Sequence, residues 1–269
     1  MRKISTLMVS VLCMMMPVGA EAQVPTAFVS KGATDIQAQP HTITQTNSGA
    51  QWAPIDPMVR SITMDDGLPS NAVRSVVQGS KGYMWFGTDN GLCRFDGYDV
   101  KTYYNPFTTV DQFVSALTAC EEGLLVGCNN GAYLFCNATD RFQKLSDKIT
   151  APVLNFSLDG DQNIWISTNG QGVFRYNLTT HELHQYPMKN IQGKVQSTLV
   201  DANNQVWMLC NHGGASIYHL NKSTDQFEAF PLKGDATMFY GMAMLAAPDG
   251  NLYVGTWENG LYKLNADGS

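Results

Sequence analysis

The sequence predicts an all-β protein built from repeated four-stranded antiparallel sheets, and two observations support this. In one motif, a short apolar run ending near a Trp or Tyr is followed six or seven residues later by a glycine that opens a second apolar run; it occurs five times. Its central positions are spaced by 40, 40, 42 and 46 residues, the length of one propeller blade. We therefore expect a β-propeller of about five blades, centred on Trp85, Leu125, Trp165, Trp207 and Tyr253.

The first unit divides into four strands in chain order. Residues 73–78 form its first strand, 83–87 its second, 92–95 its third and 100–104 its outer strand. Asp89-Asn90-Gly91 supplies the residue types of a tight hairpin. Because the apolar residues alternate or run continuously, they favour short strands over a helical solenoid. First strands recur at 114–118, 153–158 and 195–200, outer strands at 142–145, 183–186 and 227–230, and the units at approximately 65–105, 106–146, 147–187, 188–231 and 232–269.

The fifth unit lacks residues for an outer strand, because the sequence stops shortly after its third strand at 261–265. Residues 58–64 precede the first unit and belong to no sheet of their own. If they pair with the third strand of the last unit, five blades form a closed ring and two sheet edges are covered. The alternative is an incomplete ring of more blades, seven in total.

The first 22 residues have the pattern of a secretory signal. Arg2 and Lys3 precede an apolar stretch over 4–18, and Ala20-Glu21-Ala22 places small residues where a signal peptidase reads, so we expect cleavage after Ala22. Residues 23–57 are polar and carry four prolines, which predicts a loosely ordered leader to the propeller at 58–269. No other segment has the roughly 18–20 continuous apolar residues of a spanning helix. We therefore expect a periplasmic protein with no membrane insertion of this segment.

Composition narrows the classes of partner. The net charge is −6 and no basic cluster is present, which argues against nucleic acid and anionic membranes. Five cysteines follow the signal, an odd number that cannot pair fully, and we expect buried, unpaired thiols. Neither the cysteines nor the histidines have the spacing of a metal site, so we expect no metal and no cofactor.

The opening of the first unit carries a specific combination of short motifs. They are Asp66-Gly67-Leu68-Pro69 with Asn71, then Trp85-Phe86-Gly87-Thr88, Asn90-Gly91-Leu92, and Phe95-Asp96-Gly97-Tyr98. This block resembles the two-component regulator propeller repeats at the start of the periplasmic sensor region of hybrid two-component systems. The later units match more loosely, for example at Ser167 and Leu209, where the repeat has glycine.

The resemblance implies a sensor that responds to oligosaccharides released from polysaccharides. In that family the signal passes through a membrane helix to a histidine kinase and a response regulator, and so regulates genes for glycan use. This sequence has no kinase, no membrane helix and no second propeller. We therefore expect the N-terminal piece of a sensor, with the remaining sensor domains or a second sensor protomer as partners.

The loops between second and third strands should lie together on one face, because alternate hairpins leave a blade on opposite faces. Amide and carboxylate groups beside an exposed aromatic ring suit a polyhydroxylated ligand. Trp257 is the best candidate, since it is the only Trp of the propeller outside the repeated packing position. The candidate ligand-binding residues are Asp89, Asn90, Asn169, Gln171, Asn211, His212, Trp257, Glu258 and Asn259.

Three classes of function remain open. The favoured one is a non-catalytic sensor module that binds an oligosaccharide or assembles with the rest of a sensor. The second is a propeller lyase acting on a polysaccharide or an antibiotic, for which the histidines show no ligand spacing. The third is a propeller that only binds other proteins. We expect no catalytic residue.

Overall fold

The structure of the chain is a computed structural model that describes residues 61–269 except 109–110, 188–193, 212–216, 231–239, 248–249, 258–259 and 265–269. Residues 62–269 belong to one compact unit, and residues 14–61 make a second, of which only Ser61 is described. The predicted signal at 1–22 and leader at 23–57 lie outside the described residues. No helix in the described part is long and apolar enough to cross a bilayer.

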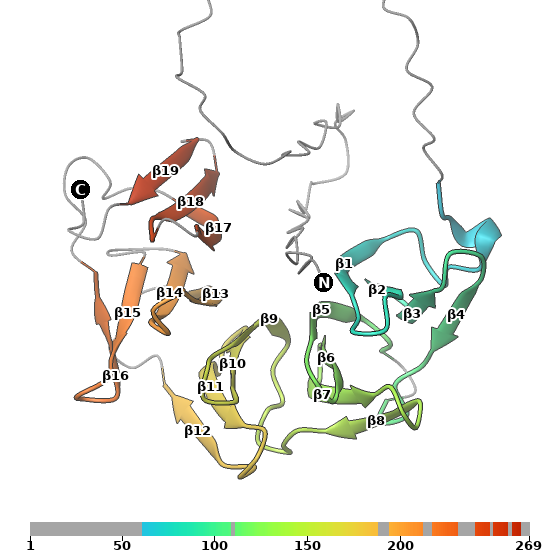
Figure 1. The fold of residues 1–269 in the computed structure, drawn as a ribbon, viewed down its shortest axis with the longest axis horizontal. Helices are drawn as coiled ribbons and strands as arrows, with labels where there is room; N and C mark the ends of the chain where they lie inside the picture. Colours follow the sequence, from blue (N-terminus) through green and yellow to red (C-terminus); the bar gives the residue numbers. More distant parts are fainter. Residues whose placement is uncertain are drawn as a thin grey trace, which may run out of the picture. The chain divides into compact units, whose positions relative to one another are not determined.

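Five antiparallel sheets follow one another along the chain, as the repeat predicts (Figure 1). Four sheets have four strands in the order of the sequence, and the last has three. The first sheet holds β1 (Val73–Gln78), β2 (Met84–Thr88), β3 (Gly91–Phe95) and β4 (Val100–Tyr103), and the second β5 (Val114–Ala119), β6 (Gly123–Cys128), β7 (Gly131–Cys136) and β8 (Arg141–Lys144). The third holds β9 (Val153–Leu158), β10 (Asn163–Thr168), β11 (Gly172–Asn177) and β12 (Leu183–Tyr186). The fourth holds β13 (Lys194–Val200), β14 (Val206–Asn211), β15 (Ile217–Asn221) and β16 (Gln226–Ala229), and the fifth β17 (Tyr240–Ala246), β18 (Leu252–Trp257) and β19 (Leu261–Leu264).

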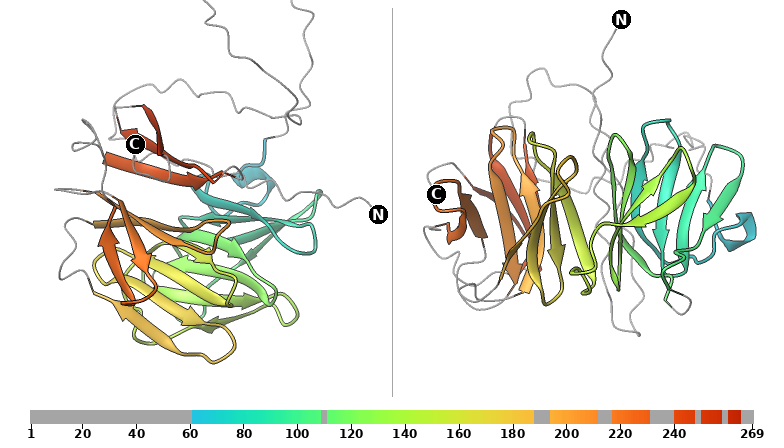
Figure 2. Two further views of the ribbon diagram at one scale, coloured as in Figure 1. Left: turned by 60° about the vertical axis from the view of Figure 1, so that its left-hand side comes forward. Right: turned by 90° about the horizontal axis from the view of Figure 1, so that it is seen from below.

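Neighbouring sheets pack face to face, which confirms the predicted propeller blades (Figure 2). The innermost strands contact each other in chain order: β1 with β5, β5 with β9, β9 with β13, and β13 with β17. Each of the four interfaces between sheets contains its own hydrophobic cluster. The repeated Trp85 and Trp165 are fully buried in two of these clusters, as expected of packing residues.

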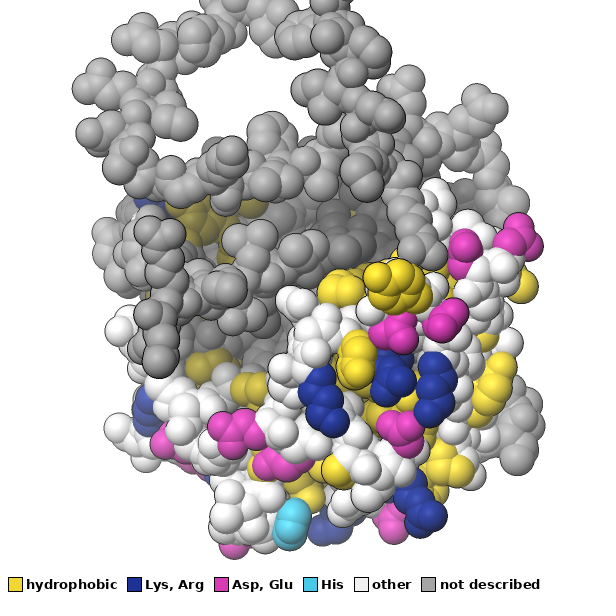
Figure 3. All heavy atoms as spheres, turned by 45° about the vertical axis from the view of Figure 1, so that its right-hand side comes forward, with side chains coloured by type: hydrophobic (Ala, Val, Ile, Leu, Met, Phe, Trp, Pro, Cys, Tyr) yellow, Lys and Arg dark blue, Asp and Glu magenta, His cyan; other side chains and the backbone are white. Residues whose placement is uncertain are grey.

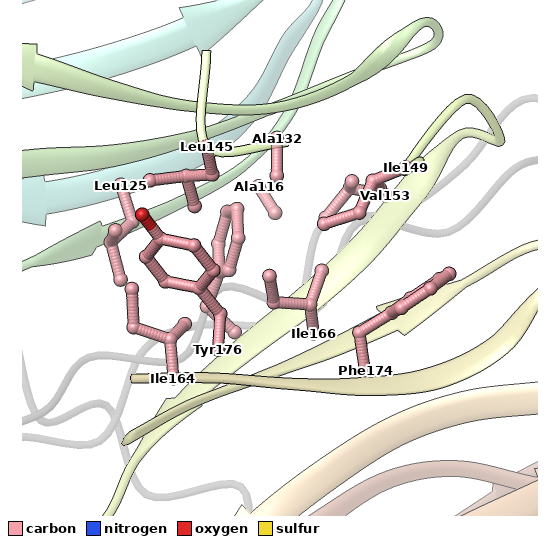
Figure 4. Packing of buried hydrophobic residues seen from close by; sticks show 11 residues of the cluster. Ala116, Leu125, Ala132, Leu145, Ile149, Val153, Ile164, Ile166, Phe174 and Tyr176 are labelled. Atoms are coloured by element: carbon pink, nitrogen blue, oxygen red, sulfur yellow. The ribbon is translucent and has the colours of Figure 1, made fainter. Parts of the chain in front are cut away.

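The cluster between the second and third sheets is wholly apolar apart from one hydroxyl (Figure 4). Leu125 and Leu145 of the second sheet face Ile164 and Tyr176 of the third. Burying each aliphatic side chain of this kind stabilises a fold by roughly 1.5–3 kcal/mol. Because the second, third and fourth sheets each bury both faces against neighbours, the chain needs no single central core.

Each first strand contains a β-bulge at the same position, a feature that the sequence analysis missed. In every sheet, one extra residue near the start of the first strand has no partner in the second strand and interrupts the ladder. The bulged residues are Arg74, Ser115, Leu154, Gln196 and Met242. Because a bulge re-aims its side chain, these residues differ from their alternating neighbours in direction.

Two glycines of the second strands allow the sheets to approach closely. A Cβ atom added at Gly87 would lie 2.7 Å from Cγ1 of Val114, and one at Gly127 would lie 2.8 Å from Cγ1 of Val153. Both valines are the first strand residues of the next sheet and are fully buried. These glycines are thus required by packing, whereas the glycines of the hairpins, such as Gly91 and Gly131, adopt positive φ.

The described part of the ring-closing segment does not form the expected strand. Residues 61–63 are irregular, and Met64–Asp66 forms a short 3-10 helix with a complete capping box. The Thr63 hydroxyl accepts from the amide of Asp65, and Asp66 Oδ2 accepts from the amide of Thr63 at 2.9 Å. The side chains of Thr63 and Asp66 thus hold the described part of this segment in a turn, and β19 has only β18 as a neighbour among the described strands.

Candidate functional site

The candidate site residues occupy equivalent positions in successive sheets. In each sheet, one residue of the second strand pairs with the first-strand residue that directly precedes the bulge. The residues that follow this second-strand residue are Asp89, Asn169, Asn211 and Trp257. Asn211 and Trp257 still lie inside their strands. The hairpins are held by a repeated contact in which Thr88, Thr168 and Thr256 donate a hydroxyl to the carbonyl of a glycine three or four residues on. The first, third and fifth sheets therefore share this hairpin contact, whereas the fourth sheet has Cys210 at the threonine position.

Asp89 is committed to an ion pair within its own sheet. Its two carboxylate oxygens accept from Nε and Nη2 of Arg74 at 2.6 and 2.9 Å, and both side chains are half-buried. The same guanidinium lies 5.5 Å from the ring centroid of Phe113 in the connection to the second sheet. Asn90, by contrast, is exposed, with a long amide contact to the carbonyl of Pro69 at 3.5 Å. Asp89 therefore orders the loop, while Asn90 is available to a ligand.

Gln171 holds a connecting segment in place. Its Oε1 accepts from the amides of Thr150 and Ala151 at 2.9 and 2.7 Å, and its Nε2 donates to the carbonyl of Lys148 at 3.1 Å. Since all the polar atoms of its side chain have partners, its first role is to fix the segment that leads into β9. Asn169 is exposed, and only its backbone amide is engaged, by the carbonyl of Pro152 at 2.8 Å.

Asn211 has an unused acceptor. Its Nδ2 donates to Oε1 of Gln196 at 3.1 Å, and its Oδ1 is buried with no hydrogen-bond partner in the structure. A buried amide oxygen without a partner costs roughly 1–3 kcal/mol. A water molecule or a donor group of a ligand would remove that cost, so Asn211 is the site residue with the clearest capacity for a further hydrogen bond.

Trp257 ends β18, and its side chain is 38% exposed. Its exposure contrasts with the burial of Trp85 and Trp165. The neighbouring candidates Glu258 and Asn259, and His212 beside Asn211, lie outside the described residues.

The sequence analysis missed the residues that orient these loops. The bulged Arg74 and Gln196 reach the loop residues Asp89 and Asn211 of their own sheets. In the second sheet, Asp111 takes over this role by accepting from Asn129 at 2.7 Å. A signal was present in the sequence, since a polar residue directly follows the first-strand valine in Val73-Arg74 and Val195-Gln196.

A second surface with mixed chemistry lies on the outer edge of the first two sheets. A groove of about 570 Å³ is lined by Tyr104, Pro106, Asp140, Arg141 and Phe142, together with the outer residues Thr102 and Tyr103. Tyr104 is 57% exposed. Figure 3 views the unit from the side of these sheets, where apolar, basic and acidic side chains are interspersed. The groove combines an accessible ring with charged groups, and we call it the rim groove.

Charged residues next to the rim groove are ordered by contact between the two sheets. Lys101 Nζ donates to Oδ2 of Asp140 at 2.8 Å, and the hydroxyl of Tyr103 donates to the same oxygen at 3.2 Å. The ammonium group of Lys101 holds the pKa of Asp140 below its usual value, so this carboxylate stays ionised at neutral pH.

A smaller pocket of about 150 Å³ lies between the third and fourth sheets, lined by Asp159, Trp165, Arg175 and Asp225 among others. Asp159 accepts there from Nε1 of Trp165 at 2.9 Å, and Asp225 accepts from Nη1 of Arg175 at 3.1 Å and from the hydroxyl of Tyr186 at 2.7 Å. Burial is the main reason why the pKa of Tyr186 is raised. Because these acidic groups already have partners within the chain, the pocket ties two sheets together.

Three of the five described cysteines are buried and inert, whereas Cys120 and Cys136 are only half-buried and a hydrogen bond with the Thr139 side chain lowers the pKa of Cys136. All five described cysteines are unpaired, and Cys93, Cys128 and Cys210 are buried, as expected. Burial raises the pKa of Cys128 and of Cys210 to about 12, so both thiols are protonated and inert near neutral pH. Within the described residues, no group of three or more His, Cys, Asp and Glu side chains has the arrangement of a metal site.

Comparison with known families supports the repeat. Residues 67–90 match the family described as two component regulator propeller, which confirms the resemblance seen in the first unit. No curated protein matches the chain.

Solved structures share the fold. The extracellular domains of two putative hybrid two component systems from B. thetaiotaomicron are similar, with TM-scores of 0.64 and 0.65 at 20% and 18% identity. The matches cover 74% and 77% of this chain but only 27% and 30% of those chains, so this chain spans less than a third of their length. Virginiamycin B lyase from Staphylococcus aureus is also similar, with a TM-score of 0.63 at 15% identity over 75% of this chain and 70% of the lyase chain.

Proposed function

We propose that this chain is a non-catalytic sensor propeller that acts in the periplasm and binds an oligosaccharide. Joined to a histidine kinase, it would regulate the transcription of genes for glycan use. The observation that carries this proposal is the two component regulator propeller repeat at 67–90, set in a fold similar to the extracellular domains of hybrid two component systems.

The chemistry of the loops supports a polyhydroxylated ligand. Asn90 and Asn169 are exposed amides, and the buried Oδ1 of Asn211 has no partner. Sugar hydroxyls can donate to such an oxygen and accept from amide groups, while the exposed ring of Trp257 can cover an apolar sugar face. The rim groove at Tyr104 is the other described surface that combines a ring with polar groups.

A thermal-shift screen of the purified chain against a panel of neutral and acidic oligosaccharides tests this proposal. A ligand that binds only the folded state at one hundred times its Kd stabilises by about 2.7 kcal/mol. For a unit of this size we expect Tm to rise by about 5 °C or more. If no member of a broad panel raises Tm, and a partner protein binds instead, the chain is a protein-interaction propeller and the sensing proposal is wrong.

Two variants separate the candidate surfaces. Asn211→Ala and Tyr104→Ala each remove one polar or aromatic group at the loops or at the rim groove, and the exposed Tyr104 contributes little to folding. We expect Asn211→Ala to reduce affinity for the active oligosaccharide about tenfold and Tyr104→Ala to leave it unchanged. The reverse result would assign the ligand to the rim groove.

The similarity to virginiamycin B lyase favours one second candidate, a propeller lyase. The solved lyase structure contains quinupristin, so incubation of the purified chain with quinupristin, followed by mass spectrometry of the products, is a direct test. We expect no turnover, because none of the three described histidines is hydrogen-bonded to an acidic side chain. The Nδ1 of His181 is hydrogen-bonded to the hydroxyl of Tyr176 at 2.9 Å, the Nδ1 of His219 is buried without a partner, and His184 is exposed beside the ring of Tyr186. Enzyme-dependent product formation would replace the sensor proposal with this one.

A further inference from the structure

The last sheet exposes a leucine at a position that is fully buried in every preceding sheet. Leu261 pairs with Gly255, as Leu92 pairs with Gly87. The same register position holds Ala132, Val173 and Ile217 in the second to fourth sheets. The exposed fraction is 0% for these four residues and 70% for Leu261.

The close-approach glycine of the last sheet has open space beside it. No atom lies within 4 Å of a Cβ built on Gly255, whereas the equivalent Gly87 and Gly127 each meet a valine of the next sheet at less than 3 Å. The backbone of Gly255 does not adopt positive φ, so its conformation does not require glycine. In the first two sheets, this position is small because a neighbouring first strand presses on it.

These residues lie on the face that points away from the rest of the unit. Leu252, Val254 and Leu264 are buried against the fourth sheet, so by strand alternation Tyr253, Gly255 and Leu261 face the other way. Leu245 of β17 pairs with Tyr253 and is 50% exposed. We call these four residues, Leu245, Tyr253, Gly255 and Leu261, the end face.

The end face has nearly the same composition as the forward face of the first sheet. Both faces present an aromatic residue, a glycine and a leucine at equivalent positions. On the first sheet these are Trp85, Gly87 and Leu92, and on the last they are Tyr253, Gly255 and Leu261. In the first sheet these residues are covered by β5–β8, and Val114 of β5 lies against Gly87. The second sheet therefore shows what kind of surface fits the end face.

We propose that the end face is an interblade docking surface whose occupant is a further four-stranded sheet of the same repeat, with a β-branched residue of its first strand seated on Gly255. The interface would continue the series already formed by the four pairs of neighbouring sheets. The lyase comparison agrees in length, because 75% of this chain accounts for 70% of that propeller chain. At about 40 residues per blade, the unmatched three tenths would hold about two more sheets.

A chain with one added sheet tests this proposal. Residues 265–269 have the same length as residues 96–100, which comprise the connection after β3 and Val100, the first residue of β4. A second copy of residues 101–145 fused after Ser269 therefore offers an outer strand and a complete β5–β8 sheet in the natural spacing. We expect hydrogen exchange of the β18 and β19 amides to slow at least tenfold in the fused chain relative to the full chain without the addition.

Gly255→Val is the matched control. The valine fills the space that the docking residue would take, so we expect it to leave Tm of the unfused chain unchanged and to abolish the added protection in the fused chain. The proposal is overturned if the fused sheet gives no protection, or if protection survives Gly255→Val.

Sedimentation velocity of the unfused chain addresses the other occupant. We expect a monomer at all concentrations, and the same result for Leu261→Lys. Concentration-dependent dimers that Leu261→Lys abolishes would identify a second copy as the occupant and overturn our assignment. Oligosaccharide binding, as proposed above, is independent of all three measurements, because it depends on the loops and not on this face.

Discussion

Two interfaces between sheets, second with third and fourth with fifth, are filled at the same position by side chains from opposite partners. In the first case Gly127 leaves room and Val153 of the next sheet fills it. In the second case the position of Gly127 is taken by Leu209, and the next first strand supplies Gly241, whose added Cβ would lie 2.5 Å from Cδ1 of Leu209. In both interfaces one sheet contributes a glycine and its neighbour contributes the larger side chain, but the sheet that contributes the glycine differs. Each pair of neighbouring sheets thus shares the space between them.

The interface between the third and fourth sheets is a third solution, made with polar atoms. Ser167 takes the glycine position, is fully buried, and donates its hydroxyl to Oγ1 of Thr198 at 3.2 Å. At the outer edge the hydroxyl of Tyr186 donates to Asp225, as that of Tyr103 donates to Asp140 between the first and second sheets, whereas the second sheet has Leu145 at this position. The departure that sets this interface apart is therefore Ser167, and its partner Thr198 lies on the neighbouring sheet.

Gly127→Val should have the largest effect, because it places two branched side chains in the space of one. The added Cβ would lie 2.8 Å from Cγ1 and 3.0 Å from Cβ of Val153, both rigidly held. We expect the free energy of unfolding to fall by about 3 kcal/mol or more, measured by urea denaturation. Gly255→Val is the control and should have no effect. Similar losses in the two variants would show that β-strand glycine, and not the approach of the next sheet, sets the cost.

Leu209→Ala should remove the residue that fills the reversed interface. The side chain is fully buried, so we expect a loss of about 2–4 kcal/mol in the same assay. Adding Gly241→Ala should return part of this stability, because the new methyl group enters the vacated space. A double variant no more stable than Leu209→Ala alone would contradict the shared-volume account.

Stability at alkaline pH tests the packing of the fourth sheet against the third. The thiol of Cys210 points toward the third sheet, and burial raises its pKa to about 12 from the ordinary value of 9.0. A raised pKa in the folded state gives stability that is complete below pH 9 and is lost as pH rises from 9 toward 12. We expect about 1.4 kcal/mol to be lost between pH 7 and 10 on this account. The loss over that interval should be smaller by this amount in Cys210→Ala, and equal slopes for the two proteins would rule the thiol out as its cause.

Asp225→Asn should have the smallest effect. Its side chain is 43% exposed and that of Arg175 is 32% exposed, so solvent weakens the ion pair. We expect a loss of about 1 kcal/mol, mostly from the hydrogen bond of Tyr186. Tyr186→Phe and the double variant complete a cycle by chemical denaturation, and additive losses would show that the two residues do not interact.

The repeat itself was readable because it depends on local chemistry. The spacing of Trp85, Leu125, Trp165, Trp207 and Tyr253 predicted five sheets, and the Asn, Asp and Gly residues of the hairpins predicted their turns. Residues 58–64 were interpreted as a ring-closing strand because they precede the first unit and belong to no sheet of their own, but within the described part Thr63 and Asp66 cap a 3-10 turn. A capping box competes with a sheet edge for the same backbone groups, and the pattern of apolar residues does not reveal which wins.

The candidate site was only partly readable. The sequence identified the loop positions but treated Asp89 and Gln171 as free groups, whereas the structure gives both of them partners within the chain. Those partners are Arg74, brought by a bulge, and the backbone of the neighbouring connection, and neither follows from the residues of the loop.

By itself the sequence determined the number of sheets, the order of their strands and the chemistry of their turns, since these depend on contacts between residues close along the chain. Tertiary structure alone decided which of two neighbouring sheets contributes the larger side chain to their interface. It also decided that Ser167 donates to Thr198 and that Leu261 faces outward on the last sheet. Those outcomes depend on the residues of the adjacent sheet, about 40 positions away, and close packing admits only one occupant for each space.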